Sequence, residues 1–224
     1  MAGQKLFLQE EVMLLALNED TGRFIRGTMF AYAAAGAILA ELLLAGRIGM
    51  ESEGRKTYVM VRNATPIGDP VLDECLDGIA RSARRQKLAT LVGRFACVWE
   101  LKHRVAGRLA DKGILRADSE KIMLIFSRRI YPERDPEPER QVVERIRQAL
   151  LGKSDPIDPR TVALIAATYP TGLLKTLFDR KQFKALKPRI EAIVQGNAIW
   201  RATKEAVEAA EAAATAAAVA AASS

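Results

Sequence analysis

Four carboxylates gather around one predicted helix start, where a pair of acids could act as general acid and base. They are Asp69, Asp73, Glu74 and Asp77. Paired carboxylates of this kind hydrolyse glycosidic bonds. Acids in the first turn of a helix also cap free N–H groups and interact favourably with the helix dipole. We assign these four residues to helix capping, and expect no catalytic role for them.

His103 is the one histidine of the chain, and an imidazole can serve as a general base near neutral pH. It stands between Lys102 and Arg104, and these like charges should lower its pKa. No serine or cysteine nucleophile stands in a recognisable motif. We therefore expect a solvated histidine, no catalytic residues, and a protein that is not an enzyme.

Cys75 and Cys97 are the two cysteines, and both lie among apolar residues, which predicts core positions. Two cysteines and one histidine exclude a disulfide scaffold and a four-cysteine zinc site. The common glycine-rich phosphate loops are missing from the sequence. We expect no metal and no cofactor.

Cations are the informative class, because the formal net charge is +7 and the pI is about 9.6. This balance favours polyanionic partners, either nucleic acid or an acidic membrane surface. Any one run of basic residues could simply be a solvated surface. Several runs gather around a predicted hairpin, however, which favours binding of a polyanion. The basic residues are Arg23, Arg26, Arg81, Arg84, Arg85, Lys87, Arg94, Lys102, Arg104, Arg108, Arg128 and Arg129.

Helical periodicity dominates the elements that must position these residues. An apolar stripe from Leu6 to Leu17 predicts an opening helix. An Ala-rich helix over 29–45, closed by Gly46, is apolar enough to be buried at the centre, and Gly36 allows close helix packing. The uncharged run 27–40 is shorter than the ~18 residues that a membrane span needs.

Three further helices are predicted to begin at an Asp-Pro pair, at Asp69, Asp135 and Asp158. Asp accepts hydrogen bonds from the first N–H groups of a helix, and Pro suits its first position. The single helical domain is expected to cover residues 1–205. From Ala206 to Ser224 the chain is almost all alanine, which predicts a helical or disordered tail.

Two stretches of similar pattern predict short hairpins. In the first, the helix to Gly46 is followed by a strand at Ile48, a charged turn over 51–56 and a strand over 58–61. The second repeats this with a helix over 105–113, a strand at 114–115, a turn over 116–121 and a strand over 122–126. The fold class is mainly α, with one or two wing-like β-hairpins. The pattern fits either winged-helix units or hairpins that cap a helical bundle.

The predicted strand 122–126 is apolar on both faces, although a half-buried strand should alternate. Either it is enclosed by the core, or it exposes Met123, Leu124, Ile125 and Phe126 for insertion into a membrane. Flanking cations at Lys121, Arg128 and Arg129 would then meet anionic headgroups. Self-association of the chain through hairpin 114–126 is another use of an exposed apolar strand.

The sequence resembles the Golgi phosphoprotein 3 family, which has bacterial members, over roughly residues 6–210. Five segments carry the resemblance, in the same order: 6–17 (LFLQEEVMLLAL), 41–48 (ELLLAGRI), 64–76 (ATPIGDPVLDECL), 109–115 (LADKGIL) and 160–165 (RTVALI). The resemblance implies a helical domain around a buried central helix. It also implies a non-catalytic peripheral membrane protein that binds phosphatidylinositol 4-phosphate and holds glycosyltransferases by their cytosolic tails, as eukaryotic members do.

The family's headgroup pocket uses a tryptophan and an arginine around the central helix, and two arginines on the helix before the second hairpin. Matched without gaps, these fall on Arg26, Ala35, Trp99 and Lys102. Only Lys102 keeps its charge, and lysine lacks the bidentate fork of arginine. Arg26 and Trp99 would supply a cation and an aromatic from exchanged positions. We expect generic binding of anionic lipids rather than strict phosphoinositide selectivity.

The sequence thus predicts a cytoplasmic protein, peripherally associated with an anionic phospholipid membrane, with an adaptor role toward cytosolic tails. Headgroup binding is assigned to Arg26, Trp99, Lys102, Arg128 and Arg129, and membrane insertion to residues 123–126. The alternative is a nucleic-acid-binding protein that uses the same cations on DNA phosphates, with steep salt dependence.

Overall fold

The protein is mainly helical in a computed structural model that describes residues 5–54, 56–122, 126–152 and 156–222. The helices are α1 (Leu8–Ala16), α2 (Phe30–Leu44), α3 (Pro70–Ala80), α4 (Leu88–Ala96), α5 (Leu101–Asp111), α6 (Glu137–Leu151), α7 (Pro159–Thr168), η1 (Leu174–Leu177), α8 (Arg180–Val194) and α9 (Ala198–Ala222). The strands are β1 (Ile48–Glu53), β2 (Lys56–Val61), β3 (Gln86–Lys87), β4 (Asp118–Ile122) and β5 (Phe126–Ile130). The predicted fold class is therefore confirmed. Within the described ranges, every helix is too short or too polar to traverse a lipid bilayer.

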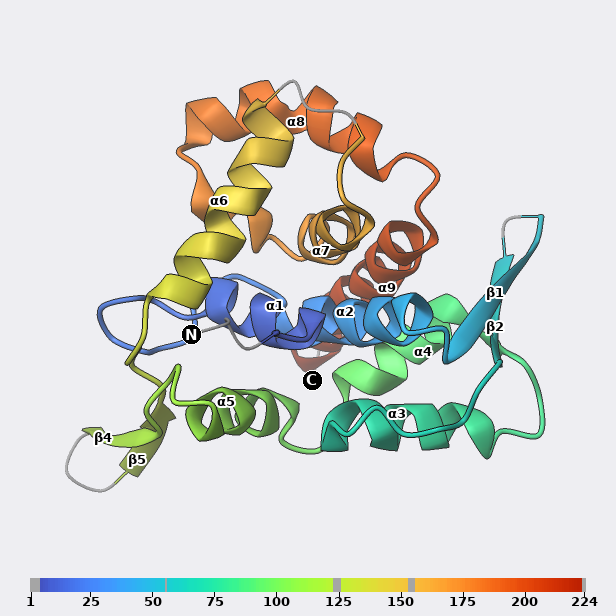
Figure 1. Cartoon of the computed structure of the whole chain (residues 1–224), viewed down its shortest axis with the longest axis horizontal. Coiled ribbons are helices and arrows are strands. Elements are labelled where there is room, and N and C mark those ends of the chain that lie inside the picture. The colour runs from blue at the N-terminus through green and yellow to red at the C-terminus, as the bar shows by residue number, and fades with distance from the viewer. Residues whose placement is uncertain (1–4, 55, 123–125, 153–155, 223–224) are drawn as a thin grey trace.

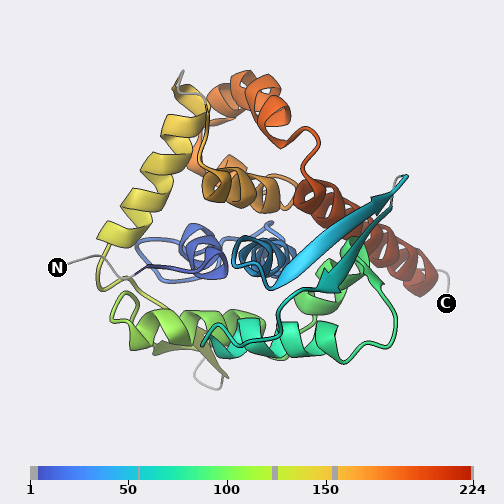
Figure 2. The same cartoon turned by 45° about the vertical axis from the view of Figure 1, so that its right-hand side comes forward.

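The Ala-rich helix α2 is the centre of the molecule, as predicted (Figure 1). It contacts α1, α4, α7 and α9, and Figure 2 shows the other helices arranged around it. Every residue from Ala33 to Leu42 is buried. A Cβ atom on Gly36 would lie 2.5 Å from Oγ1 of Thr203 on α9, so the close contact between these two helices requires glycine here.

Two of the three predicted Asp-Pro helix starts are confirmed in detail. The Asp69 carboxylate accepts hydrogen bonds from the first-turn N–H groups of α3 at 3.0 Å, and Asp158 accepts one from α7 at 2.9 Å. In both cases the following proline is the first residue of the helix. At the third, the helix begins later than predicted, at Glu137. Pro136 is itself the cap residue there, and Asp135 accepts the N–H of Glu137 at 3.1 Å.

The first hairpin follows α2 directly and is longer than predicted. Gly46 has φ +66°, which reverses the chain after the helix. Strands β1 and β2 pair in antiparallel register from Ile48 opposite Val61 to Glu53 opposite Lys56. The short strand β3, which the sequence pattern did not predict, adds to β2 and makes a three-stranded sheet.

The second hairpin has a different register from the one predicted, and it projects from the opposite side of the molecule from the first (Figure 1). The predicted turn over 116–121 is wrong, because Asp118–Ile122 forms strand β4. Glu120 faces Arg128 across the ladder and pairs with it at 3.0 Å, and such cross-strand charge pairs stabilise an antiparallel strand.

The apolar segment 122–126 is consequently not one strand. Ile122 ends β4 and pairs with Phe126, which begins β5. The predicted insertion residues Met123, Leu124 and Ile125 lie outside the described residues.

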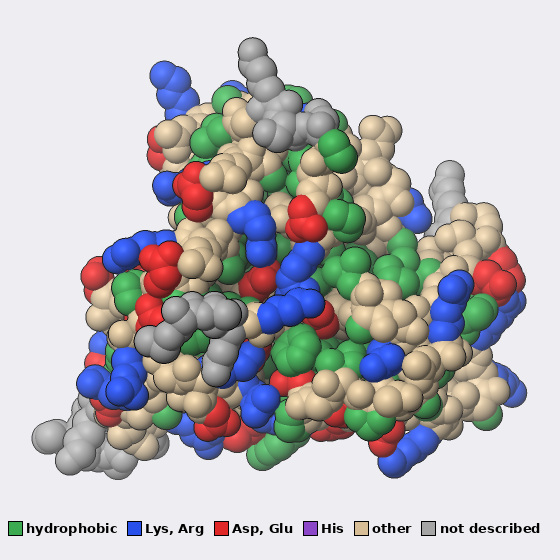
Figure 3. Space-filling model, in the orientation of Figure 1, with side chains coloured by type: hydrophobic (Ala, Val, Ile, Leu, Met, Phe, Trp, Pro, Cys, Tyr) green, Lys and Arg blue, Asp and Glu red, His purple; other side chains and the backbone are tan. Residues whose placement is uncertain are grey.

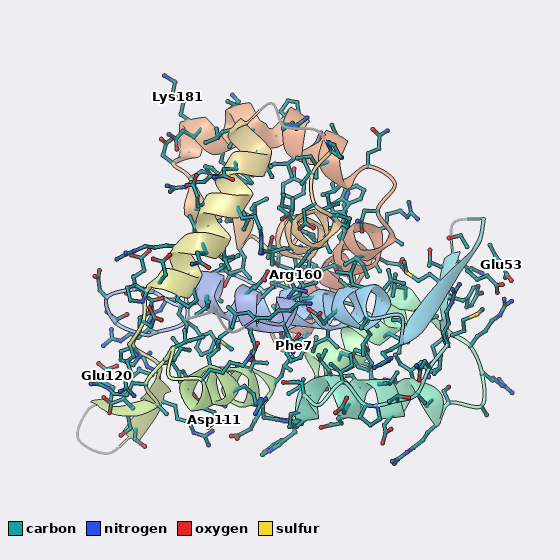
Figure 4. All side chains as sticks on the ribbon, in the orientation of Figure 1. Phe7, Glu53, Asp111, Glu120, Arg160 and Lys181 are labelled. Atoms are coloured by element: carbon teal, nitrogen blue, oxygen red, sulfur yellow. The ribbon has the colours of Figure 1, made fainter. Side chains whose placement is uncertain are left out.

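A buried ionic cluster, which the sequence analysis did not predict, joins α7 to α1 and α2. Arg160 on α7 pairs with Glu11 at 3.2 Å and with Glu41 at 2.9 Å, and both carboxylates are almost fully buried. Figure 4 shows Arg160 at the centre of the fold, beside α1 and α2. Glu41 also accepts the N–H of Leu8 at 2.7 Å, so it fixes the start of α1. These contacts fix α1 and α2, the two helices that the loop before α2 connects, against α7.

Helix α9 runs without a break through residue 205, where the sequence analysis placed the start of a separate tail. Ala206 and Val207 are buried, so the packed part of this helix extends past that point.

Candidate functional site

A hollow of 530 Å³ opens where the start of α2 meets the connection between α4 and α5. One wall is the loop before α2 together with its first turn, and the other is the end of α4 and the start of α5. The lining is mostly apolar, with one cation and one acid: Phe24, Ile25, Thr28, Met29, Phe30, Ala31, Tyr32, Ala96, Val98, Glu100, Leu101 and Lys102. We call this the headgroup hollow.

Backbone hydrogen bonds fix the wall before α2. The Ile25 N–H donates to the carbonyl of the last residue of α1 at 2.9 Å, and the Met29 N–H donates to the carbonyl of Thr171 at 3.0 Å. The Thr28 hydroxyl donates to the Ile25 carbonyl at 2.9 Å. Phe24 and Phe30 pack with their ring centroids 5.5 Å apart. The loop is thus tied to α1 and to the turn after α7.

The N-terminus of α2 forms part of this wall. Its cap residue, Met29, gives no side-chain hydrogen bond to the first turn. The first N–H groups of a helix have no intrahelical partner and carry a partial positive charge. Because Phe30 and Ala31 line the hollow, this positive end faces it and favours an anion there.

Glu100 shapes the opposite wall through its backbone. It has φ 49° and ψ 27°, and among the described residues it is the one non-glycine with positive φ. This conformation costs a residue with a Cβ about 1–2 kcal/mol, and it turns the chain sharply from Trp99 into α5. The Glu100 carboxylate accepts two hydrogen bonds from Arg129, both of 3.1 Å, which lower the pKa of Glu100.

One of the predicted headgroup residues lines the hollow, and two others adjoin lining residues in the sequence. Lys102 lines it, with Nζ 5.5 Å from the centroid of the Phe24 ring. Trp99 lies between two lining residues and is 79% exposed. Arg26 is exposed in the loop that forms the first wall. Within the described part of the chain, neither Arg26 nor Lys102 has a carboxylate partner. Their role in binding stays a prediction.

The two predicted headgroup residues on the second hairpin are paired with acids. Arg128 bonds to Glu120 at 3.0 Å, and Arg129 bonds to Glu100. Glu120 also accepts hydrogen bonds from Arg23. Figure 4 places Glu120 on this hairpin, and Figure 3 shows cations and acids interspersed over the same face of the molecule. Both arginines lie on β5. Arg129 contacts the rim of the headgroup hollow through Glu100, whereas Arg128 contacts the other strand of the hairpin, through Glu120.

Two predictions for single residues are wrong. His103 is not solvated but half-buried, and its Nδ1 lies 2.7 Å from the hydroxyl of the buried Tyr131. Burial, followed by the charges of Lys102 and Arg129, lowers the pKa of His103.

Cys97 is exposed because α4 ends one residue before it, whereas Cys75 is buried as predicted.

The predicted carboxylate cluster has structural roles. Asp69 caps α3, and Asp73 accepts the N–H groups of the preceding loop at 2.6 and 3.1 Å. Glu74 pairs with Arg104 at 2.6 Å, and Asp77 pairs with Arg81 at 2.9 Å. The assignment to helix capping is thus confirmed for Asp69, whereas Asp73 binds the preceding loop and Glu74 and Asp77 form ion pairs.

Sequence reasoning missed the residues that build the hollow itself, namely Phe24, Thr28, Met29 and Glu100. None belongs to a motif. The short connection between α4 and α5 requires a sharp turn of the chain. Glu100 makes that turn with a left-handed backbone, but glutamate is not a residue type that indicates such a conformation.

Comparison with known proteins gives one family. A family model described as Golgi phosphoprotein 3 (GPP34) matches residues 8–210. Vacuolar protein sorting-associated protein 74 of Schizosaccharomyces pombe is 25% identical over 211 residues, which cover 80% of this chain and 62% of that protein. The protein of the same name from Eremothecium gossypii is 24% identical over 226 residues, covering 85% and 68%. The match thus spans less than two thirds of the length of the first relative.

Proposed function

Because the chain belongs to the Golgi phosphoprotein 3 family, we propose that it is a non-catalytic peripheral membrane protein that binds the phosphorylated headgroup of an anionic lipid. The binding site is the headgroup hollow. One observation supports this proposal: Lys102 lines the hollow and Arg26 and Trp99 adjoin its lining residues, although Arg26 lies far from the other two in the sequence.

The hollow offers a phosphate group three kinds of contact. The uncapped N-terminus of α2 supplies backbone N–H groups and a partial positive charge. Lys102 and Arg26 supply full charges, and the exposed indole of Trp99 suits the boundary between water and lipid. Since lysine is a point charge without a fork, discrimination of phosphatidylinositol 4-phosphate from other anionic lipids should be modest.

Attachment to the membrane would also involve the second hairpin. Its strand β5 is joined to the rim of the hollow by the Arg129–Glu100 pair, so hairpin and hollow can meet one surface. We assign apolar insertion to residues 123–126 and supporting charge to Arg128 and Arg129. Each cation near an anionic surface contributes about 1 kcal/mol, which gives only reversible binding without the apolar residues.

We further propose an adaptor role, which the names of the two relatives, vacuolar protein sorting-associated proteins, support. At the cytoplasmic face of a membrane, a lipid-bound domain could hold the cytosolic tails of membrane proteins. The second candidate function is binding of duplex DNA, which the cations near the second hairpin favour. It is the weaker one, because the cations near the second hairpin, Arg23, Arg128 and Arg129, are paired with acids, whereas the lipid proposal rests mainly on Arg26 and Lys102.

Co-sedimentation with liposomes tests the proposal. The liposomes are neutral, or contain phosphatidylserine, cardiolipin or phosphatidylinositol 4-phosphate, and duplex DNA is added as competitor. The double variant Lys102→Ala/Arg26→Ala should lose most binding to anionic liposomes. Its matched control, Lys184→Ala/Lys187→Ala, removes the same charge from exposed positions of α8 and should bind like the wild type.

Equal loss in both double variants would show that net charge alone drives attachment, and would contradict a defined site. Binding to duplex DNA without binding to any liposome would contradict the lipid function itself.

A further inference from the structure

A second hollow, whose lining includes three cations, lies at the other end of α4 from the headgroup hollow. It measures 210 Å³ and is enclosed by the start of β2, the start of α4 and the start of α9. Its charged lining residues are Lys56, Lys87, Arg201 and Glu205. We call it the basic hollow, and the proposed function does not use it.

The three cations converge from three elements. Lys56 begins β2, Lys87 is the cap residue of α4, and Arg201 belongs to the first turn of α9. Nη1 of Arg201 donates to the Gly196 carbonyl at 3.3 Å, which keeps the guanidinium beside the start of α9. With Glu205 as the one acid of the lining, the hollow carries a net charge of two positive.

The charges of the two lysines are not neutralised within the described part of the chain. Neither Lys56 nor Lys87 has an ion pair with a described acid, and both are exposed at the mouth of the hollow. The neighbouring Arg85 differs, because Glu53 holds it in two hydrogen bonds. The acids of the first hairpin thus neutralise the arginine beside the hollow and leave the two lysines in it available.

The framework around the basic hollow is rigid. Lys87 faces Tyr58 in the ladder between β2 and β3, and helices α4 and α9 contact both each other and α2. The first turn of α4, at Leu88 and Ala89, lines the hollow without a capping side chain. Its free N–H groups add to the positive potential of the three side chains.

We infer that the basic hollow binds a phosphate monoester. Three convergent cations favour a compact dianion over chloride, because each can form a charge-assisted hydrogen bond to a different oxygen. At about 30 Å³ per water molecule, 210 Å³ accommodates a phosphate group with several waters. Glu205 opposes the anion, so removal of its charge should strengthen binding. The phosphate group can belong to a soluble ester or to a lipid.

Titration of the full chain with glycerol 3-phosphate, a soluble phosphate monoester, at constant ionic strength and followed by amide NMR, is the soluble arm of the test. The Thr57, Ala89 and Ala202 amides should shift in a saturable way. Lys56→Ala/Lys87→Ala should weaken the affinity about tenfold or more, and Glu205→Gln should tighten it several-fold. The control Lys184→Ala/Lys187→Ala should leave it unchanged.

The lipid arm uses phosphatidylcholine vesicles with and without phosphatidic acid, a lipid phosphate monoester. It is run in the wild-type background and in the Lys102→Ala/Arg26→Ala background, so that the effect of Lys56→Ala/Lys87→Ala is measured with and without the headgroup hollow. Loss of vesicle binding in Lys56→Ala/Lys87→Ala assigns the phosphate to a lipid, and an effect confined to glycerol 3-phosphate assigns it to a soluble ester. If neither arm depends on Lys56 and Lys87, or if Glu205→Gln weakens binding, the inference is wrong.

Discussion

Glu100 and Arg129 form a two-bond ion pair, with both N–O distances 3.1 Å, that joins the rim of the headgroup hollow to strand β5. Glu100 is the one acid in the lining of that hollow. Its partner neutralises it, so that an anion in the hollow meets the charge of Lys102 and the end of α2 without an opposing free carboxylate. Under the proposed function, the pair would link headgroup affinity to the position of the hairpin.

Breaking this pair from either side should change lipid affinity in opposite directions. Glu100→Gln removes the acid and should raise the affinity for anionic liposomes, and Arg129→Ala frees the acid and should lower it. Because the pair is exposed, we expect roughly two- to fivefold effects. Co-sedimentation at fixed ionic strength measures both. A loss of affinity in Glu100→Gln would contradict this role.

The positive φ of Glu100 predicts a difference between two variants that both lack the carboxylate. Glu100→Gly can adopt φ 49° freely, whereas Glu100→Ala keeps a Cβ in a strained conformation. The glycine variant should be the more stable of the two by about 1 kcal/mol. Urea unfolding measures this difference, and equal stabilities would mean that the backbone at this position is not strained.

The buried cluster around Arg160 predicts a large loss of stability. Arg160→Ala would leave Glu41 buried without a described cation partner, and would leave Glu11 with Arg145 alone. Breaking a buried ion pair from one side costs about 3–5 kcal/mol. Arg140→Ala, in an exposed and long pair with Glu137, should change the free energy of unfolding by less than about 0.5 kcal/mol. Similar values for the two variants in urea unfolding would refute the structural role of the cluster.

Glu139 predicts a pH dependence of stability. Burial, and contact with Glu133, raise the pKa of Glu139 from 4.5 to about 9, and the charge of Glu19 adds to this. The folded state thus holds a proton that the unfolded state has lost, and stability falls as pH rises from about 4.5 to about 9. Above that range this contribution is constant.

Melting temperatures at pH 5, 7 and 9 measure this effect. Glu139→Gln keeps a neutral side chain at all pH values, so its melting temperature should fall less over the range than that of the wild type. Parallel curves for the two proteins would show that Glu139 does not bind the proton.

The central helix and the starts of α3 and α7 could be predicted because local signals set them. The run of small apolar residues in α2 has to be buried, and Asp69 and Asp158 cap the next turn of their own chain. The second hairpin could not be predicted in register, since the charged residues of β4 resemble a turn until their partners on β5 are known. Glu120 stabilises a strand only because Arg128 lies opposite it.

Three residues in or next to the headgroup hollow were named from the sequence, on a family resemblance and not on a local signal, and their role in binding stays a prediction. Resemblance to a family indicated Arg26, Trp99 and Lys102, but no local pattern brings the loop before α2 to the start of α5. That approach depends on long-range contacts, such as the Met29 N–H to the Thr171 carbonyl. The bond of His103 to Tyr131 is equally non-local, which is why a histidine between two cations was expected in solvent.

Fluorescence of Trp99 tests the central claim most directly, that the headgroup hollow faces the lipid surface. Trp200→Phe leaves Trp99 as the only tryptophan of the chain. Vesicles that contain phosphatidylinositol 4-phosphate and brominated phosphatidylcholine should then quench its emission and shift it to the blue, and Lys102→Ala/Arg26→Ala should abolish both effects. If the protein sediments with these vesicles while Trp99 remains unquenched, another surface meets the membrane and the proposed site is wrong.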